Sequence, residues 1–188
     1  MKSKIREYLN LKYKTMSKKI TLIVAFIGMI TLQSCVKEEI VRDNVDYDTI
    51  SEVFEYSNVD FHSGNGYSVF LDYPHTIYTS DMVLVYRLAD YGSSGDVWKP
   101  MPETYYFNDG TLDFGYDNDF TRYDAQVNLF GYDLPGLSNA YKLDQVFRVV
   151  IIPAYFGNKN ANNVDLKDYK AVIKYFDIDE SKITKIEM

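Results

Sequence analysis

Few residues in this chain of 188 could carry out chemistry on their own, and the single cysteine is the most distinctive of them. Cys35 ends the stretch Leu-Gln-Ser-Cys, directly after ITLIVAFIGMITL, a run from Ile20 to Leu32 that holds no charge. The run is shorter than the roughly 20 apolar residues that a membrane-spanning helix needs. Its length and its basic flank are typical of the apolar core of a secretory signal, so the sequence predicts an amino-terminal signal helix.

The residues around Cys35 resemble the lipobox of bacterial lipoproteins, in which an aliphatic residue, a variable position and a small residue precede a cysteine. Leu32, Ser34 and Cys35 fill the three diagnostic positions. The resemblance implies that a diacylglycerol is attached to the Cys35 thiol and that the chain is cut just before it. Two or three acyl chains hold a protein firmly to a membrane. We therefore expect a lipid-anchored protein of the cell envelope, at the outer membrane, with the periplasmic or surface side left open.

This processing predicts three segments: a signal peptide at 1–34, a charged, lipidated tether at 35–49 and a single β-rich globular domain at 50–188. Met1 and Met16 are both candidate start residues, because Met16-Ser17-Lys18-Lys19 would itself be an ordinary beginning of a signal.

The charge of the mature chain narrows the classes of partner. Residues 35–188 hold 13 basic and 26 acidic side chains, which gives a net charge of −13. Such a charge argues against nucleic acid, whose phosphates need basic side chains, and against a chain that lies flat on anionic lipid. No second cysteine is available for a disulfide, so stability has to come from an apolar core.

The pattern beyond residue 50 is typical of β-structure. Aromatic residues make up 16% of the chain, and apolar side chains alternate with others in three stretches, at 82–88, 112–117 and 123–129. Such alternation predicts strands with one solvent-facing side, and Asp109-Gly110 predicts a hairpin. Short strands between frequent turns favour an antiparallel β-sandwich, immunoglobulin-like or related, with one C-terminal helix.

One strand should be buried on both sides. The stretch VFRVVIIP, Val146 to Pro153, is apolar on both faces except for Arg148, which predicts a central strand. A helix capped by Asp165 and running to about Phe176 would cover its second face, and the tail KITKIEM could add a last short strand. This order resembles small uncharacterised cell-envelope lipoproteins of the Bacteroidota, a resemblance that implies no particular activity.

The candidate metal ligands form no complete pattern. His62 and His75 lack the spacing of a zinc site. Asp117 and Asp119 could offer oxygens to Ca²⁺, but the glycine and the bidentate Glu of an EF-hand do not follow at the required positions. A solvated loop is the alternative interpretation, and no cofactor is expected.

The function that the sequence favours is non-catalytic binding. Trp98, Tyr105 and Tyr106 could form an aromatic platform for a sugar, although a tryptophan of the core is the alternative for Trp98. No G-x-S-x-G elbow is present. We therefore expect a lipid-anchored binding or interaction module for a glycan or a protein partner. The alternative is an envelope hydrolase that acts on polysaccharide or peptide.

Overall fold

The computed structural model describes residues 50–93, 95–154 and 163–188, all of which belong to one compact unit, Val45–Met188. Three predictions concern residues outside the described ranges: the signal peptide at 1–34, the tether at 35–49 and the lipobox residues Leu32, Ser34 and Cys35.

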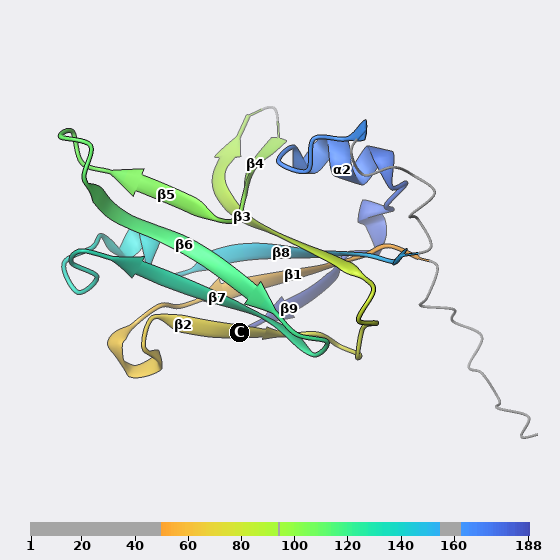
Figure 1. Cartoon of the computed structure of the whole chain (residues 1–188), viewed down its shortest axis with the longest axis horizontal. Coiled ribbons are helices and arrows are strands. Elements are labelled where there is room, and N and C mark those ends of the chain that lie inside the picture. The colour runs from red at the N-terminus through yellow and green to blue at the C-terminus, as the bar shows by residue number, and fades with distance from the viewer. Residues whose placement is uncertain (1–49, 94, 155–162) are drawn as a thin grey trace, which may run out of the picture. The chain divides into compact units, whose positions relative to one another are not determined.

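Two β-sheets pack face to face, and a helix lies against one of them (Figure 1). The five-stranded sheet has the order β4-β3-β8-β1-β9, and the four-stranded sheet has the order β2-β7-β6-β5. The strands are β1 (Glu52–Val59), β2 (Ser68–Asp72), β3 (Met82–Gly92), β4 (Gly95–Pro100), β5 (Glu103–Tyr106), β6 (Leu112–Phe120), β7 (Asp124–Gly131), β8 (Gln145–Ile152) and β9 (Thr184–Glu187). The described residues also form the 3₁₀ turns η1 (Ser63–Asn65), η2 (Asn139–Tyr141) and η5 (Glu180–Lys182) and the α-helix α2 (Tyr169–Tyr175). This sandwich with one C-terminal helix confirms the predicted fold class.

The hairpin predicted at Asp109-Gly110 joins β5 to β6. Gly110 has a φ of +85°, a conformation that glycine adopts without the steric cost of a side chain. The Asp109 carboxylate accepts hydrogen bonds from the backbone N–H and the hydroxyl of Thr111, at 2.9 and 2.7 Å. The turn thereby fixes the register in which Tyr106 faces Leu112.

Strand β8 is central, as predicted, and both of its faces are covered. Its neighbours are β3 on one side and β1 on the other. Val149 and Ile151 face the four-stranded sheet, whereas Val150 and Ile152 belong to a second apolar cluster with the helix. The predicted last strand is confirmed as β9, which pairs with β1 in parallel.

The expectation that 82–88 would have one solvent-facing side is wrong. In β3, Val83 and Val85 point into the sandwich, and Met82, Leu84 and Tyr86 pack in the helix-side cluster. Because the helix-side cluster covers the second face of the five-stranded sheet, the first part of β3, residues 82–87, is covered on both sides, like its neighbour β8.

The helix begins three residues later than predicted. Asp168 is its N-cap and accepts a hydrogen bond from Ala171 N at 3.1 Å. Asp165 instead holds the preceding turn by accepting from Lys167 N at 2.9 Å. The Tyr86 hydroxyl donates to the Leu166 carbonyl at 2.6 Å, and this bond ties that carbonyl to the sheet rather than to a helix.

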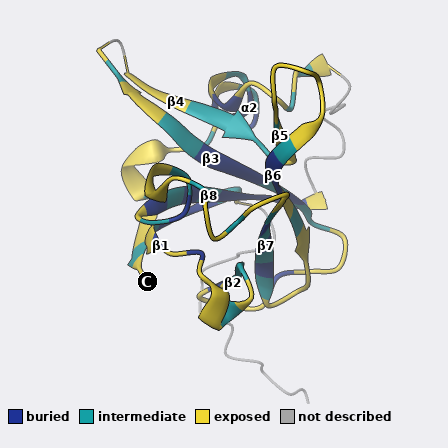
Figure 2. Ribbon diagram, turned by 90° about the vertical axis from the view of Figure 1, so that its left-hand side faces the viewer, coloured by how far each residue is buried: buried dark blue, intermediate teal, exposed yellow. Residues whose placement is uncertain are grey.

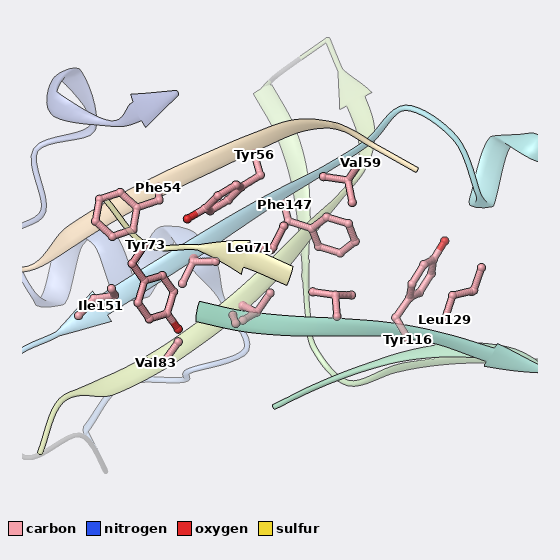
Figure 3. Close-up of a cluster of buried hydrophobic side chains, with 14 of the residues drawn as sticks. Phe54, Tyr56, Val59, Leu71, Tyr73, Val83, Tyr116, Leu129, Phe147 and Ile151 are labelled. Atoms are coloured by element: carbon pink, nitrogen blue, oxygen red, sulfur yellow. The ribbon is translucent and has the colours of Figure 1, made fainter. Parts of the chain in front are cut away.

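Two tyrosines of the apolar interior, Tyr56 and Tyr116, place their hydroxyls against backbone carbonyls. Tyr56 of β1 is fully buried and donates to the Asp72 carbonyl of β2 at 2.7 Å, which links the two sheets. Tyr116 of β6, also fully buried, donates to the Tyr141 carbonyl in η2. Figure 3 shows these rings among Phe54, Val59 and the other core residues. Most buried hydroxyls have such partners, and these two tyrosines both fill the core and hold its parts together.

Burial of both faces of β8 can be tested by truncating one side chain on each face. Val149→Ala and Val150→Ala should each lower the free energy of unfolding by about 2 kcal/mol, because each leaves a cavity. Val97→Ala is the control, since Val97 is 45% exposed, and its effect should stay within about 0.5 kcal/mol. Urea unfolding followed by circular dichroism measures all three. A neutral Val150→Ala would contradict the helix packing.

Candidate functional site

The three aromatic residues predicted for binding point in different directions. Trp98 of β4 lies on the helix side, with its ring centroid 5.5 Å from that of Tyr169. Tyr105 of β5 points into the sandwich and stacks on Phe114 at 4.4 Å. Tyr106 is 61% exposed. The structure therefore does not bring the three together, and Tyr106 alone presents a broad exposed ring.

The Trp98 ring belongs to a partly buried ion-pair cluster on the helix side. The Arg148 guanidinium carbon lies 4.1 Å from the centre of the Trp98 ring. Arg148 also forms ion pairs with Glu55 at 2.7 Å and Glu180 at 3.0 Å, and it donates to the Tyr169 hydroxyl at 2.7 Å. The charge of Arg148 is paired with two carboxylates, and the face of its guanidinium packs on the Trp98 ring. Arg148 therefore connects the five-stranded sheet to the C-terminal segments.

A second ion-pair cluster lies between the two sheets. Arg87 of β3 donates to both carboxylate oxygens of Glu103 of β5, at 3.0 and 3.1 Å, and to Gln145 at 3.1 Å. Lys99 pairs with the same carboxylate at 2.9 Å, and Tyr105 donates to it. A bidentate arginine–carboxylate pair is among the stronger hydrogen-bonded contacts, and here it joins one sheet to the other.

We call the group of Arg87, Lys99, Glu103 and Tyr105 the inner cluster. Its ionisation suits a structural role better than proton transfer. Burial alone would raise the pKa of Glu103, but the hydrogen bonds from Arg87, Tyr105 and Lys99 outweigh it and hold the pKa below its ordinary value. Burial would likewise lower the pKa of Arg87, and the hydrogen bonds to Glu103 raise it instead. Both groups therefore keep their charges, so Glu103 is poorly suited to act as a general acid at neutral pH.

A pocket of about 560 Å³ opens beside the inner cluster, between β3 and the loop that enters β8. Arg87, Asp90, Asn139, Asp144 and Gln145 contribute to its lining. The Gln145 amide is already used, because it accepts from Arg87 and donates to two backbone carbonyls. The most buried polar groups of the pocket are thus committed to one another.

The metal-ligating side chains do not converge. Within the described ranges, no group of three or more His, Cys, Asp or Glu side chains is arranged to hold a metal ion. Asp117 and Asp119, the candidate calcium ligands, are exposed positions two residues apart on β6. His62 lies at the η1 turn, and His75 pairs with Glu52 at 2.6 Å.

Within the described part of the chain, one side of the four-stranded sheet carries neither the second sheet nor the helix. We call it the outer face, and it comprises the side chains that alternate with the buried ones. These are Ser68, Phe70 and Asp72 of β2; Thr104 and Tyr106 of β5; Gly115, Asp117 and Asp119 of β6; and Asp124, Gln126, Asn128 and Phe130 of β7. The set contains four aspartates, three aromatic rings and no basic residue. In Figure 2, exposed positions along these strands alternate with intermediate (teal) and buried (dark blue) positions.

The middle of the outer face is a row of linked polar side chains. Ser68 donates to the Asn128 amide oxygen at 2.7 Å, and the Gln126 amide nitrogen donates to Ser68 at 2.7 Å and to Asn128 at 3.1 Å. In the described part of the chain, the Asn128 amide nitrogen and the Gln126 amide oxygen have no partner. Asp117 lies opposite Asn128 and Asp119 opposite Gln126.

One aromatic ring of the outer face sits on a glycine. Gly115 lies directly opposite Phe130 in the β6–β7 ladder. A Cβ atom added to Gly115 would come within 2.7 Å of the Phe130 ring and 2.7 Å of the Glu103 carbonyl oxygen. The ring therefore fills the space above Gly115. Phe130 is only half-buried, so part of its ring remains open to solvent.

Of the residues on the outer face, the sequence analysis named Tyr106 as a candidate binding residue and Asp117 and Asp119 as candidate calcium ligands, and it named neither Phe130 nor Asn128. The alternation in Asp124 to Leu129 already indicated which side chains point outward. The missing signal was the register between β6 and β7, which places Gly115 beside Phe130.

The described residues contain no helix long and apolar enough to cross a membrane. Comparisons with protein-family models, with curated proteins and with solved structures give no match to the chain.

The lowered pKa of Glu103 makes a pH-dependent contribution to stability. Its stabilisation should be complete above pH 4.5, the ordinary value for the group, and should be lost as the pH falls through the lower folded-state pKa. Glu103→Gln should lower the free energy of unfolding by about 3 kcal/mol at pH 7, because it leaves the Arg87 charge buried without its partner.

In urea unfolding experiments, the difference in stability between the wild type and Glu103→Gln should shrink as the pH falls below 4.5. Glu187→Gln, at an exposed position, serves as the control and should change stability by less than about 0.5 kcal/mol. A pH-independent difference would show that the inner cluster gains nothing from the Glu103 charge.

Proposed function

We propose that this chain is a lipid-anchored protein of the cell envelope whose globular part is a non-catalytic binding module, with the outer face as its binding surface. The observation that carries the proposal is the composition of that face. It combines half-buried and exposed rings with a polar row whose members are already held by one another. Groups held in place before binding lose less entropy when a ligand arrives.

The anchor rests on the resemblance of Leu32, Ser34 and Cys35 to a lipobox, together with the basic flank and the apolar run before them. A lipidated cysteine followed by a charged segment would hold the module close to the membrane and leave its sheets in the aqueous phase. Placement at the outer membrane is part of the proposal and draws on the separate resemblance to cell-envelope lipoproteins of the Bacteroidota.

Hydrolysis of a polysaccharide or peptide is the alternative, and the carboxyl groups support it less well. A glycoside hydrolase of the common type needs a carboxyl whose pKa is raised, so that it can protonate the leaving group. Among the described residues, the carboxyl groups with a clear shift are Glu55, Glu103, Asp109 and Asp179, and hydrogen bonds lower the pKa of each. Binding is therefore the better-supported function.

The anchor is tested by Cys35→Ala in a bacterium that processes lipoproteins. We expect the variant to take up no labelled fatty acid and to accumulate as the longer precursor, because the thiol that accepts the lipid is gone. Ser34→Ala is the matched control, since alanine is also small and should permit lipidation. Fatty-acid labelling and intact mass measure both, and labelled, shortened Cys35→Ala would refute the anchor.

The binding surface is tested by Phe70→Ala and Tyr106→Ala in the full-length lipidated protein. Each variant should capture about tenfold less material from detergent-solubilised envelopes than the wild type does, because binding energy concentrates in a few aromatic residues. Tyr91→Ala is the control: Tyr91 is 74% exposed but lies on β3 of the other sheet. Equal capture by all four proteins would place the binding surface elsewhere.

A further inference from the structure

We infer that the ligand of the outer face is a neutral glycan chain that runs along β6 and β7. This inference rests on the proposed function and adds the chemical class of the ligand. Three properties of the face support it: a ring seated on a glycine, a row of amides with both donors and acceptors, and a charge that excludes anions.

The Phe130 ring lies close against the backbone of the sheet and does not project far from the outer face. Because Gly115 has no side chain, the ring can occupy the space over the glycine backbone. A ring that packs against the backbone in this way is held in position. Its solvent-exposed side is suited to contact with the C–H face of a sugar ring. Phe70 and Tyr106 are exposed by 53% and 61% and add rings on the two edge strands.

The polar row matches hydroxyl groups better than it matches cations. A sugar hydroxyl both donates and accepts hydrogen bonds, as the serine hydroxyl does. The row offers the Asn128 amide nitrogen as a donor and the Gln126 amide oxygen and the Asp117 and Asp119 carboxylates as acceptors. A cationic partner would use only the acceptors and would leave the Asn128 donor facing an ammonium or guanidinium group. The mixture therefore favours vicinal hydroxyls.

The charge of the face excludes anionic glycans. Asp72, Asp117, Asp119 and Asp124 all belong to it, and no lysine, arginine or histidine does. A uronic acid polymer or a phosphorylated lipid headgroup would bring like charges together, which costs binding energy. A neutral chain meets no such repulsion, and its hydroxyls can donate to the carboxylates.

The dimensions of the face suit a chain rather than a single sugar. From Gly115 to Asp119 the strand advances four residues, or about 14 Å at the usual rise. The Phe130 ring lies at one end of this path, and Phe70 lies at the other end, opposite Gln126. A linear glycan could contact the Phe130 ring with one unit and the polar row with the next.

The experiment uses the full-length lipidated protein in detergent and divides solubilised envelopes into three portions. One is left intact, one is treated with mild periodate, which cleaves vicinal diols of sugars, and one is digested with protease. Capture should survive the protease and be lost after periodate. The captured material should also pass through an anion-exchange column at neutral pH, as a neutral glycan does.

Two variants tie the glycan to the named groups. Phe130→Leu keeps an apolar side chain but removes the ring, and Asn128→Asp removes the free amide donor in the same shape. Capture of the protease-treated material should fall about tenfold for Phe130→Leu and about fivefold for Asn128→Asp, as expected from the worth of one ring contact and one hydrogen bond. Tyr91→Ala is again the control, and urea unfolding verifies that each variant is folded.

The outcomes separate this inference from the function on which it rests. Capture that resists periodate and is lost after protease would mean a protein ligand, which overturns the glycan while the binding module stands. Retention on the anion-exchange column would overturn the neutral class. Capture of nothing by the wild-type protein would overturn the proposed function itself.

Discussion

A strand that is apolar on both faces needs cover on both sides, and β8 imposes that requirement on the whole domain. Its odd-numbered residues Val149 and Ile151 face the second sheet, and the even-numbered Val150 and Ile152 face the helix. Since one layer can cover only one face, the domain needs three layers. The helix is consequently committed to the five-stranded sheet, and among the described residues no second layer packs on the other side of the four-stranded sheet.

The two ion-paired arginines of the five-stranded sheet lie on opposite faces, and Arg87 is buried whereas Arg148 is partly buried. Arg87 points into the sandwich and pairs with Glu103, whereas Arg148 points to the helix side and pairs with Glu55 and Glu180. A buried ion pair adds little net stability over an apolar pair, but removing one member is costly. Each arginine therefore penalises an arrangement in which its carboxylates are absent, which makes both clusters selective for this packing of layers.

The parts of the fold that could be predicted from the sequence are those with a local signal. Strand β8 follows from its continuous apolar run, the β5–β6 turn from Asp109-Gly110, and the β6 and β7 faces from alternation. The helix start was wrong because Asp165 and Asp168 are equally good caps, and the choice depends on a bond from Tyr86, which is far away in the chain. The same limit applies to the site, since Gly115 and Phe130 become neighbours only through the register of two strands.

The pairing of Gly115 with Phe130 suggests what the outer face is organised to do. Glycine inside a strand weakens it, because it adds conformational freedom and packs nothing. A β-branched residue at position 115 would strengthen an ordinary strand, but its side chain would collide with the Phe130 ring and with the Glu103 carbonyl. The ring offsets part of the loss by covering the glycine backbone. It could have done so fully buried, yet it stays half-open beside a polar row whose remaining donor and acceptors also face solvent. Under the proposed function, the open side of this ring and these polar groups are what a flat, hydroxylated chain would contact.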